Sequence, residues 1–228
     1  MMEITAPLPK RIGLLADSHD HFESLDTAIQ LLNKRGADVL IHLGDICDSL
    51  RPDLLEDSIR LLQEHNIMAV KGNNDFILEN RLENQPYEDQ VRTERSVSFL
   101  KHLPMTITWG DICFAHSLPF DYLGAFYEPI DMGSPQKARE LFKITSHRIL
   151  FCGHSHQSVL FCWNEGDATR EMIPLDCSIP FDPDERYIIV TGSVFEEECA
   201  LFDTEKWSLE RISIPSAESS PIQKLPCL

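Results

Sequence analysis

Short apolar runs alternate with segments of helical spacing in the first 75 residues. The runs at residues 12–16, 39–43 and 68–70 are short enough to be buried strands. Between them, apolar residues at 25, 28, 29 and 32, and again at 55, 59 and 62, recur with the period of an amphipathic helix. Gly36 is placed to end the first helix, and Asp53 with Glu56 has the spacing of a capping box for the second. The order strand, helix, strand, helix, strand predicts a parallel sheet with right-handed crossovers.

The rest of the chain predicts further strands and two more helices. A hairpin is expected at 106–109 and 112–115, and strands at 148–152, 158–163, 187–191, 199–202 and 207–214. Residues 76–104 are polar and charged, with a helix expected only at 96–102, and another helix is expected at 136–143. The aromatic-rich loop at 118–135 is expected to pack on the domain, with stacking on a nucleobase as the alternative. We expect one α/β domain over residues 1–214, with a second, more antiparallel sheet, followed by a tail at 215–228.

Composition and charge narrow the class of protein. The 228 residues are 43% hydrophobic and 25% charged, as in ordinary folded domains, and the formal net charge is −17. This acidity argues against binding to duplex nucleic acid or to an anionic membrane, although metal ions could still supply positive charge for a phosphate substrate. Seven cysteines without a CxxC pair indicate no disulfide framework, and the chain has no run of 18 apolar residues and no recognisable signal peptide. We therefore expect a cytoplasmic protein.

Polar residues follow five of the predicted strands, at the point where each strand ends. They form the segments 17–19 (Asp-Ser-His), 44–45 (Gly-Asp), 72–75 (Gly-Asn-Asn-Asp), 116 (His) and 153–156 (Gly-His-Ser-His). Each segment alone has an ordinary explanation, such as a turn or a surface histidine. Because ligands bind at the carboxyl ends of the strands in open α/β sheets, we expect the five segments to converge. In an extended chain, Asp17 and His19 would point the same way, as would His154 and His156.

In order and in type, these segments resemble the motifs of the calcineurin-like metallophosphoesterase superfamily, over residues 11–193. The segment 17–21 and its short distance to residues 44–45 are similar to the small bacterial and archaeal phosphodiesterase branch. The resemblance implies a four-layer α/β/β/α sandwich of two mixed sheets, with two divalent metal ions about 3.5–4 Å apart. Carried over one position at a time, the implied ligands are Asp17, His19 and His156 for the first ion, Asn73, His116 and His154 for the second, and Asp45 as the bridge.

The implied cofactor is therefore a pair of divalent metal ions. Carboxylate, imidazole and amide donors together suit manganese first, with iron or zinc as alternatives, and do not suit a metal that prefers thiolates. Two such ions would polarise the phosphoryl oxygens and lower the pKa of a bridging water, so that the hydroxide attacks the phosphorus in line. The imidazole of His42 lies within a predicted strand and is expected in the core, not among the ligands.

Two segments depart from the family pattern. Many members carry a histidine that assists the leaving group directly after the ligand asparagine, whereas this chain has Asn74 there. An amide does not titrate near neutral pH, so Asn74 could donate a hydrogen bond to phosphate but could not act as an acid. His21 is our hypothetical substitute, with packing over the first helix as the alternative, and Asp75 is expected to orient neighbouring groups from behind the ligands. The segment 192–194 (Gly-Ser-Val) resembles one that borders the active site, but a solvated acidic turn is expected at 195–198, where an arginine is usual.

Together these patterns predict a hydrolase that cleaves a phosphodiester or a phosphoanhydride, because a good leaving group does not need the missing histidine. One alternative is a phosphomonoesterase or protein phosphatase. Another is a scaffold of the same fold without catalysis, which the intact ligand positions disfavour. The expected partner is a small phosphate ester or a nucleotide, and the oligomeric state is left open.

Overall fold

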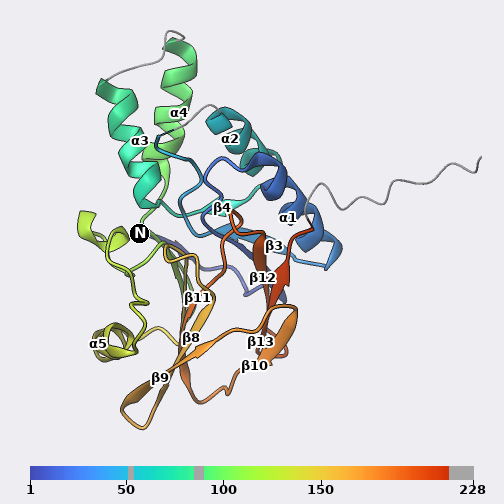
Figure 1. Ribbon diagram of the computed structural model, residues 1–228, viewed down its shortest axis with the longest axis vertical. Helices are drawn as coiled ribbons and strands as arrows, with labels where there is room; N and C mark the ends of the chain where they lie inside the picture. Colours follow the sequence, from blue (N-terminus) through green and yellow to red (C-terminus); the bar gives the residue numbers. More distant parts are fainter. Residues whose placement is uncertain (51–53, 85–89, 216–228) are drawn as a thin grey trace, which may run out of the picture.

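Two mixed β-sheets pack face to face in the computed structural model, which describes residues 1–50, 54–84 and 90–215 (Figure 1). The six-stranded sheet has the order β10 (Cys177–Pro180), β13 (Ser208–Ser213), β12 (Glu198–Asp203), β2 (Arg11–Leu15), β3 (Val39–His42) and β4 (Met68–Ala69). The seven-stranded sheet has the order β1 (Met2–Ile4), β5 (Thr106–Trp109), β6 (Ile112–Ala115), β7 (Ile149–Cys152), β11 (Arg186–Val190), β8 (Val159–Asn164) and β9 (Asp167–Met172). The predicted parallel unit is confirmed, because β3 pairs in parallel with both β2 and β4. β12, which follows much later in the chain, adds to the other side of β2 in antiparallel orientation.

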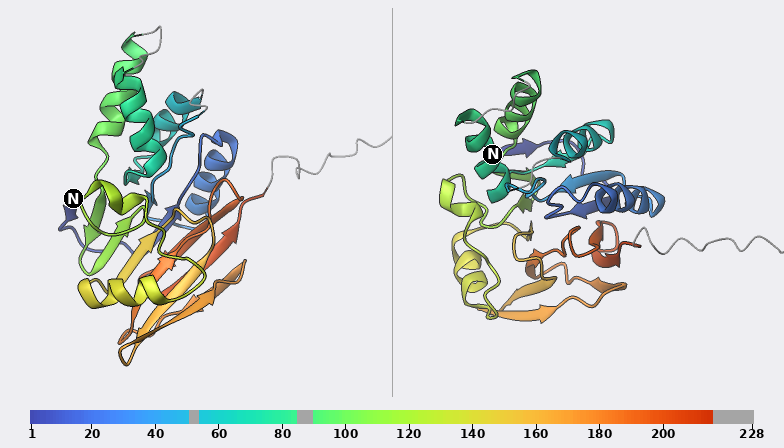
Figure 2. Two further views of the ribbon diagram at one scale, coloured as in Figure 1. Left: turned by 60° about the vertical axis from the view of Figure 1, so that its left-hand side comes forward. Right: turned by 45° about the horizontal axis from the view of Figure 1, so that its top comes forward.

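Helices cover the outer face of each sheet, which gives the expected four-layer α/β/β/α sandwich (Figure 2). α1 (Phe22–Lys34) and α2 (Leu55–Glu64) pack outside the six-stranded sheet, and α5 (Gln136–Ile144) packs outside the seven-stranded sheet. α3 (Asn73–Asn84) and α4 (Gln90–His102) pack against each other and project from one end of the sandwich (Figure 1). A 3₁₀ helix, Leu123–Phe126, lies between β6 and α5. Within the described part of the chain, none of the helices is both long and apolar enough to cross a membrane.

Alternating residues along the strands divide the core into an inner and an outer part. Ile12 and Leu14 of β2 face the other sheet and belong to one cluster with Phe114 and Phe151, whose rings stack at a centroid distance of 5.6 Å. Leu15, on the opposite face of β2, packs with the buried stripe of α1 at residues 25, 28, 29 and 32. This division arises because successive side chains of a strand point to opposite faces of the sheet. The polar loops begin where the strands end.

Several elements differ from the sequence prediction. α3 and the first part of α4 are helical where the polar sequence predicts none, because a small shared cluster that includes Leu78, Leu82 and Leu100 holds the two helices together. β1, β9 and β10 are also unpredicted; each is an edge strand with mostly exposed residues, so it lacks a clear hydrophobic alternation. α2 begins at Leu55 with Leu54 at its N-cap, and the predicted cap Asp53 lies outside the described residues, as do tail residues 216–228.

The strand order brings the predicted polar segments to one end of the sandwich. The segments at 17–19, 44–45 and 72–75 follow β2, β3 and β4, which are parallel neighbours. His116 and the segment 153–156 follow β6 and β7, which are parallel neighbours in the facing sheet. The carboxyl ends of five strands thus surround one polar centre.

Candidate metal centre

The loops after β2 and β3 are tied together by backbone hydrogen bonds. Asp17, His19 and Asp45 in these loops have left-handed backbone, with φ of +50°, +44° and +54°. Residues other than glycine rarely adopt this conformation, which costs about 1–2 kcal/mol each. Tertiary hydrogen bonds maintain it. Three N–H groups of the first loop donate to three carbonyls of the second: Asp17 to Gly44 (3.0 Å), His19 to Asp45 (3.2 Å) and Asp20 to Ile46 (3.0 Å).

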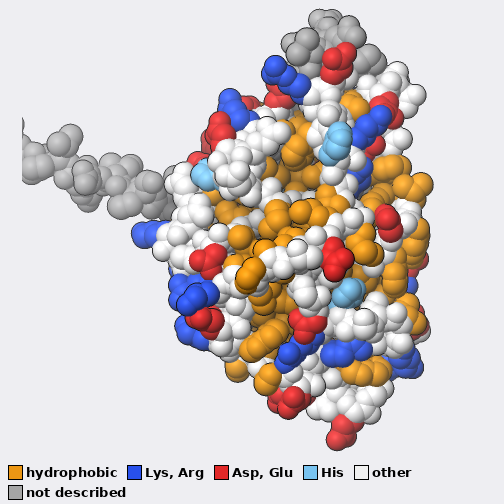
Figure 3. Space-filling model, turned by 180° about the vertical axis from the view of Figure 1, so that it is seen from behind, with side chains coloured by type: hydrophobic (Ala, Val, Ile, Leu, Met, Phe, Trp, Pro, Cys, Tyr) orange, Lys and Arg blue, Asp and Glu red, His pale blue; other side chains and the backbone are white. Residues whose placement is uncertain are grey.

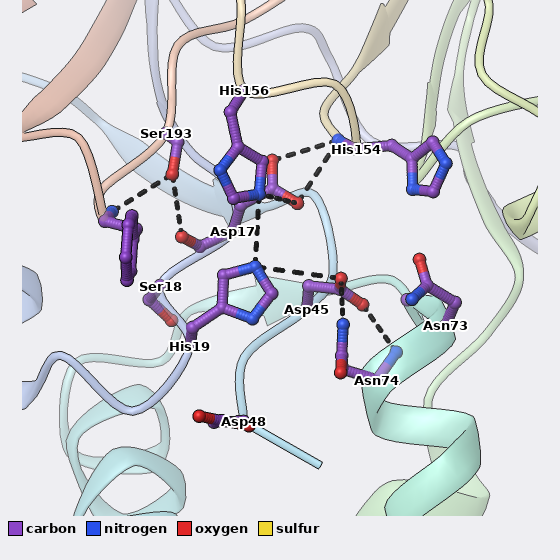
Figure 4. A network of polar contacts seen from close by, with 12 residues as sticks. Asp17, Ser18, His19, Asp45, Asp48, Asn73, Asn74, His154, His156 and Ser193 are labelled. Carbon is purple, nitrogen blue, oxygen red and sulfur yellow. Dashed lines mark hydrogen bonds and ion pairs between the residues drawn. The ribbon is translucent and has the colours of Figure 1, made fainter. Parts of the chain in front are cut away.

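Three of the predicted ligands form a first cluster, shown in Figure 4. Asp17, His19 and His156 each offer a ligand atom, and these atoms all lie within 4.8 Å of one another. His19 Nε2 lies 3.1 Å from His156 Nε2, and His156 Nε2 lies 3.8 Å from Asp17 Oδ1. The structure therefore brings together the three residues that the family resemblance assigns to the first ion.

A second cluster surrounds the buried ring of His116. Its Nε2 lies 2.9 Å from Asn73 Oδ1, 3.1 Å from His154 Nδ1 and 3.6 Å from Asp45 Oδ1. Ligand atoms of His116, Asp45 and Asp17 also lie within 4.8 Å of one another, so Asp17 belongs to both clusters. The structure thus brings all seven predicted ligand residues to one centre.

The local geometry of the paired motifs differs from the sequence expectation. His154 and His156 both have left-handed backbone, with φ of +75° and +58°, so the segment is not extended. The two rings consequently diverge, with His154 against His116 and His156 against His19. The segment that carries Asp17 and His19 is not extended either, and its side chains converge through a turn rather than through strand alternation.

Burial controls the protonation of the centre. Asp17 and Asp45 have 0% and 2% of their surface exposed, and burial raises the pKa of both carboxyl groups, with the charge of Asp45 as the second cause at Asp17. Burial also lowers the pKa of the four histidines of the clusters, to about 4 for His116 and His154. The imidazoles are therefore neutral near pH 7, and their contacts of 3.6–3.9 Å with carboxylate oxygens are not ion pairs.

This donor set fits divalent metal ions. A neutral imidazole has a free lone pair, and a buried carboxylate is stable only with a positive partner or a proton. Among the described residues, no Lys or Arg forms an ion pair with Asp17 or Asp45. His116 has the orientation typical of a ligand, because its Nδ1–H donates to the carbonyl of Leu43 over 2.9 Å and Nε2 is left facing the cluster. The two clusters are therefore candidate metal sites.

Asn74 and Asp75 both contact the loop after β3, from the start of α3. The Asn74 backbone N–H donates to Asp45 Oδ1 over 2.8 Å, and its side-chain amide donates to Asp45 Oδ2 over 2.7 Å. The fully buried Asp75 carboxylate accepts hydrogen bonds from the N–H groups of Asp45, Ile46 and Gly72 at 2.8–3.0 Å. Burial, followed by the charge of Asp45, raises the pKa of Asp75 to about 6. Asp75 thus lies behind the candidate ligands and shapes their loop.

His21 lies outside both clusters, at the N-cap of α1. Its exposed ring packs against Phe195, with ring centroids 4.5 Å apart. Phe195 in turn lies 6.0 Å from the ring centroids of both His19 and His156. His21 is therefore at the rim of the first cluster, and its ring contact is with Phe195.

The Gly-Ser-Val segment borders the centre, while the turn that follows differs from expectation. Ser193 Oγ donates to the carbonyl of Asp17 over 2.9 Å. Residues 196–197 are exposed, as expected for a solvated acidic turn. Glu198 is not solvated: it begins β12, its side chain is 14% exposed, and its carboxylate accepts two hydrogen bonds from Arg211 of the neighbouring β13. Strand pairing therefore neutralises one of the three glutamates.

Two further contacts at the centre escape the sequence prediction. Ser49 Oγ donates to Asn74 Oδ1 over 2.6 Å, and the backbone carbonyl of Tyr127 accepts a hydrogen bond from His154. Both residues lie in loops without periodicity, so no sequence signal identifies them.

The aromatic-rich loop at 118–135 packs on the domain only in part, since Phe126 is buried whereas Tyr122 and Tyr127 remain 49% and 43% exposed.

Comparisons with known proteins show relatives of this chain and of its fold. Over 70 residues the chain is 31% identical to the phosphodiesterase MJ0936 of Methanocaldococcus jannaschii. The aligned segment covers 28% of this chain and 36% of that protein, so the match spans about a third of the relative's length. The fold is similar to a metallophosphoesterase from Sphaerobacter thermophilus, with a TM-score of 0.72 and 21% identity over 92% of this chain and 91% of that one. It is also similar to the protein PH1004 of Pyrococcus horikoshii OT3, with a TM-score of 0.61 and 14% identity over 90% and 87% of the two chains. Residues 11–172 match the calcineurin-like phosphoesterase superfamily domain, and the chain belongs to this superfamily.

Proposed function

We propose that this protein hydrolyses a phosphodiester or a phosphoanhydride with two divalent metal ions. Membership of the superfamily supports a metal-dependent hydrolase, and the partial match to an archaeal phosphodiesterase supports the class of substrate. The observation that carries the proposal is the convergence of two clusters of ligand atoms at one end of the sandwich. The proposed ligands are Asp17, His19 and His156 for the first ion, Asn73, His116 and His154 for the second, and Asp45 for both.

The position of Asp45 supports its role as the bridge. Its Oδ2 lies 3.9 Å from His19 Nε2 of the first cluster, and its Oδ1 lies 3.6 Å from His116 Nε2 of the second. Each carboxylate oxygen thus faces a different cluster. Mixed oxygen and nitrogen donors favour manganese, with iron or zinc as alternatives.

Around the ions, the chain's own groups would position the substrate and handle the proton. When bound, the two ions would supply positive charge at the phosphoryl oxygens and lower the pKa of a water between them so that it can attack. Asn74 would hold Asp45 and donate a hydrogen bond to the phosphate, but its amide cannot protonate a leaving group. His21, whose ring is exposed at the rim, is the proposed proton donor for poor leaving groups.

The absence of a titratable group at position 74 favours substrates whose leaving group needs little assistance. Phosphoanhydrides and diesters of acidic alcohols meet this condition better than alkyl monoesters. The net charge of −17 favours a small ester over duplex nucleic acid. On the face shown in Figure 3, Lys and Arg side chains are interspersed with acidic ones and form no continuous basic surface. The six cysteines in the described residues are all free thiols, which supports a cytoplasmic location.

A manganese-supplemented assay tests the proposal. The protein is stripped with EDTA, reloaded, and given bis(4-nitrophenyl) phosphate, 4-nitrophenyl phosphate and a dinucleoside polyphosphate. We expect the diester or the polyphosphate to be cleaved faster than the monoester. Asp45→Asn and His156→Gln should lose both metal content and more than about 100-fold in rate, beyond the effect of groups that only orient ligands. His65→Gln, at an exposed histidine, is the matched control.

Two outcomes would contradict the proposal. Equal or greater cleavage of the monoester would favour a phosphomonoesterase. A wild-type protein that binds no manganese in metal analysis would favour the non-catalytic scaffold.

A further inference from the structure

An exposed aromatic ring lies at the edge of the metal centre. Phe195 keeps 41% of its surface exposed, although burial of a phenylalanine is strongly favourable. Its ring centroid lies 6.0 Å from the centroids of both His19 and His156, two members of the first cluster. The ring also packs against His21 at a centroid distance of 4.5 Å, and its exposed surface remains open beside the first cluster.

The backbone holds Phe195 in this position. Its N–H donates to Ser193 Oγ over 3.1 Å and to the Asp17 carbonyl over 3.2 Å, and Figure 4 shows Ser193 joined to Asp17 as well. At the other end of the turn, the Glu198 N–H donates to the Ser193 carbonyl over 2.9 Å, and the Glu198 side chain is paired with Arg211. The turn is anchored at both ends, so the ring is presented from ordered backbone next to the loop that carries the first cluster.

The chemistry around the ring restricts what can lie against it. Phe195 offers an apolar surface without hydrogen-bonding groups, which suits the face of a planar ring and selects no particular polar edge. Glu196 and Glu197 are exposed next to it, and the charge of Glu196 acts on His156. These carboxylates would repel further phosphate groups on this side. The occupant that fits is therefore planar, aromatic and uncharged.

We infer that Phe195 is the stacking surface for a nucleobase that is joined through its sugar to the phosphate under attack. The substrate class is then a diester of a nucleoside monophosphate, with the nucleoside on the side of the first cluster and no polyphosphate chain there. This inference rests on the proposed function. Beyond that function, it makes Phe195 a residue that determines specificity, because the ring would select the alcohol that stays on the phosphate after cleavage.

Two esters with the same leaving group test the inference. The 4-nitrophenyl ester of thymidine 5′-monophosphate and methyl 4-nitrophenyl phosphate differ only in the retained alcohol. In the manganese-loaded wild type, KM should be lower for the thymidine ester. Phe195→Leu should raise KM for the thymidine ester about 5- to 150-fold, the range for one base stacked on an aromatic side chain, and change KM for the methyl ester less than about twofold. Phe195→Trp should keep the low KM, because it keeps the aromatic face.

Direct binding and a matched control complete the test. Calorimetric titration should show that Phe195→Leu weakens binding of thymidine 5′-monophosphate and leaves binding of inorganic phosphate unchanged. Tyr122→Leu removes another exposed ring, which stacks only on Phe120 among the described rings, and should change neither KM. Equal KM values for the two esters in the wild type, or an equal rise for both in Phe195→Leu, would overturn the inference. A wild type that cleaves neither ester would instead contradict the proposed function.

Discussion

Asn74 donates hydrogen bonds to both carboxylate oxygens of Asp45, from its backbone N–H to Oδ1 at 2.8 Å and from its side-chain amide to Oδ2 at 2.7 Å. Ser49 Oγ donates to Asn74 Oδ1 over 2.6 Å, which fixes the orientation of the amide. The residue that replaces the expected histidine therefore acts on the proposed bridging carboxylate. We propose that these hydrogen bonds give Asn74 a positioning role, which does not require it to transfer a proton.

Replacing Asn74 tests this positioning role. Asn74→Ala keeps the backbone hydrogen bond but removes the amide that donates to Asp45 Oδ2, so we expect a loss of about 10- to 100-fold in manganese affinity or in kcat/KM. Ser49→Ala should cause a smaller loss in the same direction. Asn80→Ala, on the exposed face of the same helix, controls for an effect on α3. Wild-type metal affinity and rate in Asn74→Ala would contradict the role.

The dependence of rate on the leaving group tests His21. In a series of aryl diesters, His21→Ala should steepen the decline of kcat with rising pKa of the leaving alcohol, because the proposed proton donor is lost. Asn74→His should flatten the decline, because it restores a titratable group beside the phosphate. An unchanged slope in His21→Ala would show that His21 only packs against Phe195.

A methyl group at Gly72 should disrupt the centre. A Cβ at this position would lie 2.2 Å from both the backbone nitrogen and Oδ1 of Asp45, closer than atoms can approach. We expect Gly72→Ala to lower the free energy of unfolding by about 1–3 kcal/mol and to abolish metal loading, as measured by urea unfolding and metal analysis. Gly110→Asn, at a left-handed turn with open space around it, should have neither effect. Full metal loading in Gly72→Ala would mean that the loops carrying Gly72 and Asp45 can move apart without loss of the metal sites.

His42 should make the stability of the metal-free protein depend on pH. Its Nε2–H donates to Ser18 Oγ, its Nδ1 has no partner, and burial lowers its pKa to about 3. Between pH 3 and the ordinary pKa of 6.5, the unfolded state binds the extra proton, so stability falls as the pH decreases through this window. In EDTA, His42→Gln should reduce the slope of the unfolding free energy by up to about 1.4 kcal/mol per pH unit between pH 6 and pH 4.5.

Urea titrations at several pH values measure this slope. His65→Gln, at an exposed histidine, is measured alongside as the matched control. The same slope in wild type and His42→Gln would show that His42 is protonated in the folded state.

The sequence prediction succeeds where a pattern is local and strong. The apolar stripe of α1 is fully buried, and Gly36 follows the helix with φ of +82°. It fails for α3, because the leucines at 78 and 82 contact other helices and give no clear amphipathic period within their own polar segment. It also fails for Glu198, because the partner that removes it from solvent, Arg211, lies across a strand pair.

For the candidate site, the sequence alone established which residue types end each strand and in what order they occur. These features are local, since a short apolar run followed by a carboxylate, amide or imidazole is visible without any fold. How those residues combine depends on contacts between distant segments: His19 meets His156, 137 positions away, through left-handed turns that tertiary hydrogen bonds hold in place. The position of Phe195 beside these rings has the same origin, because packing of the two sheets and pairing with Asp17 place it there.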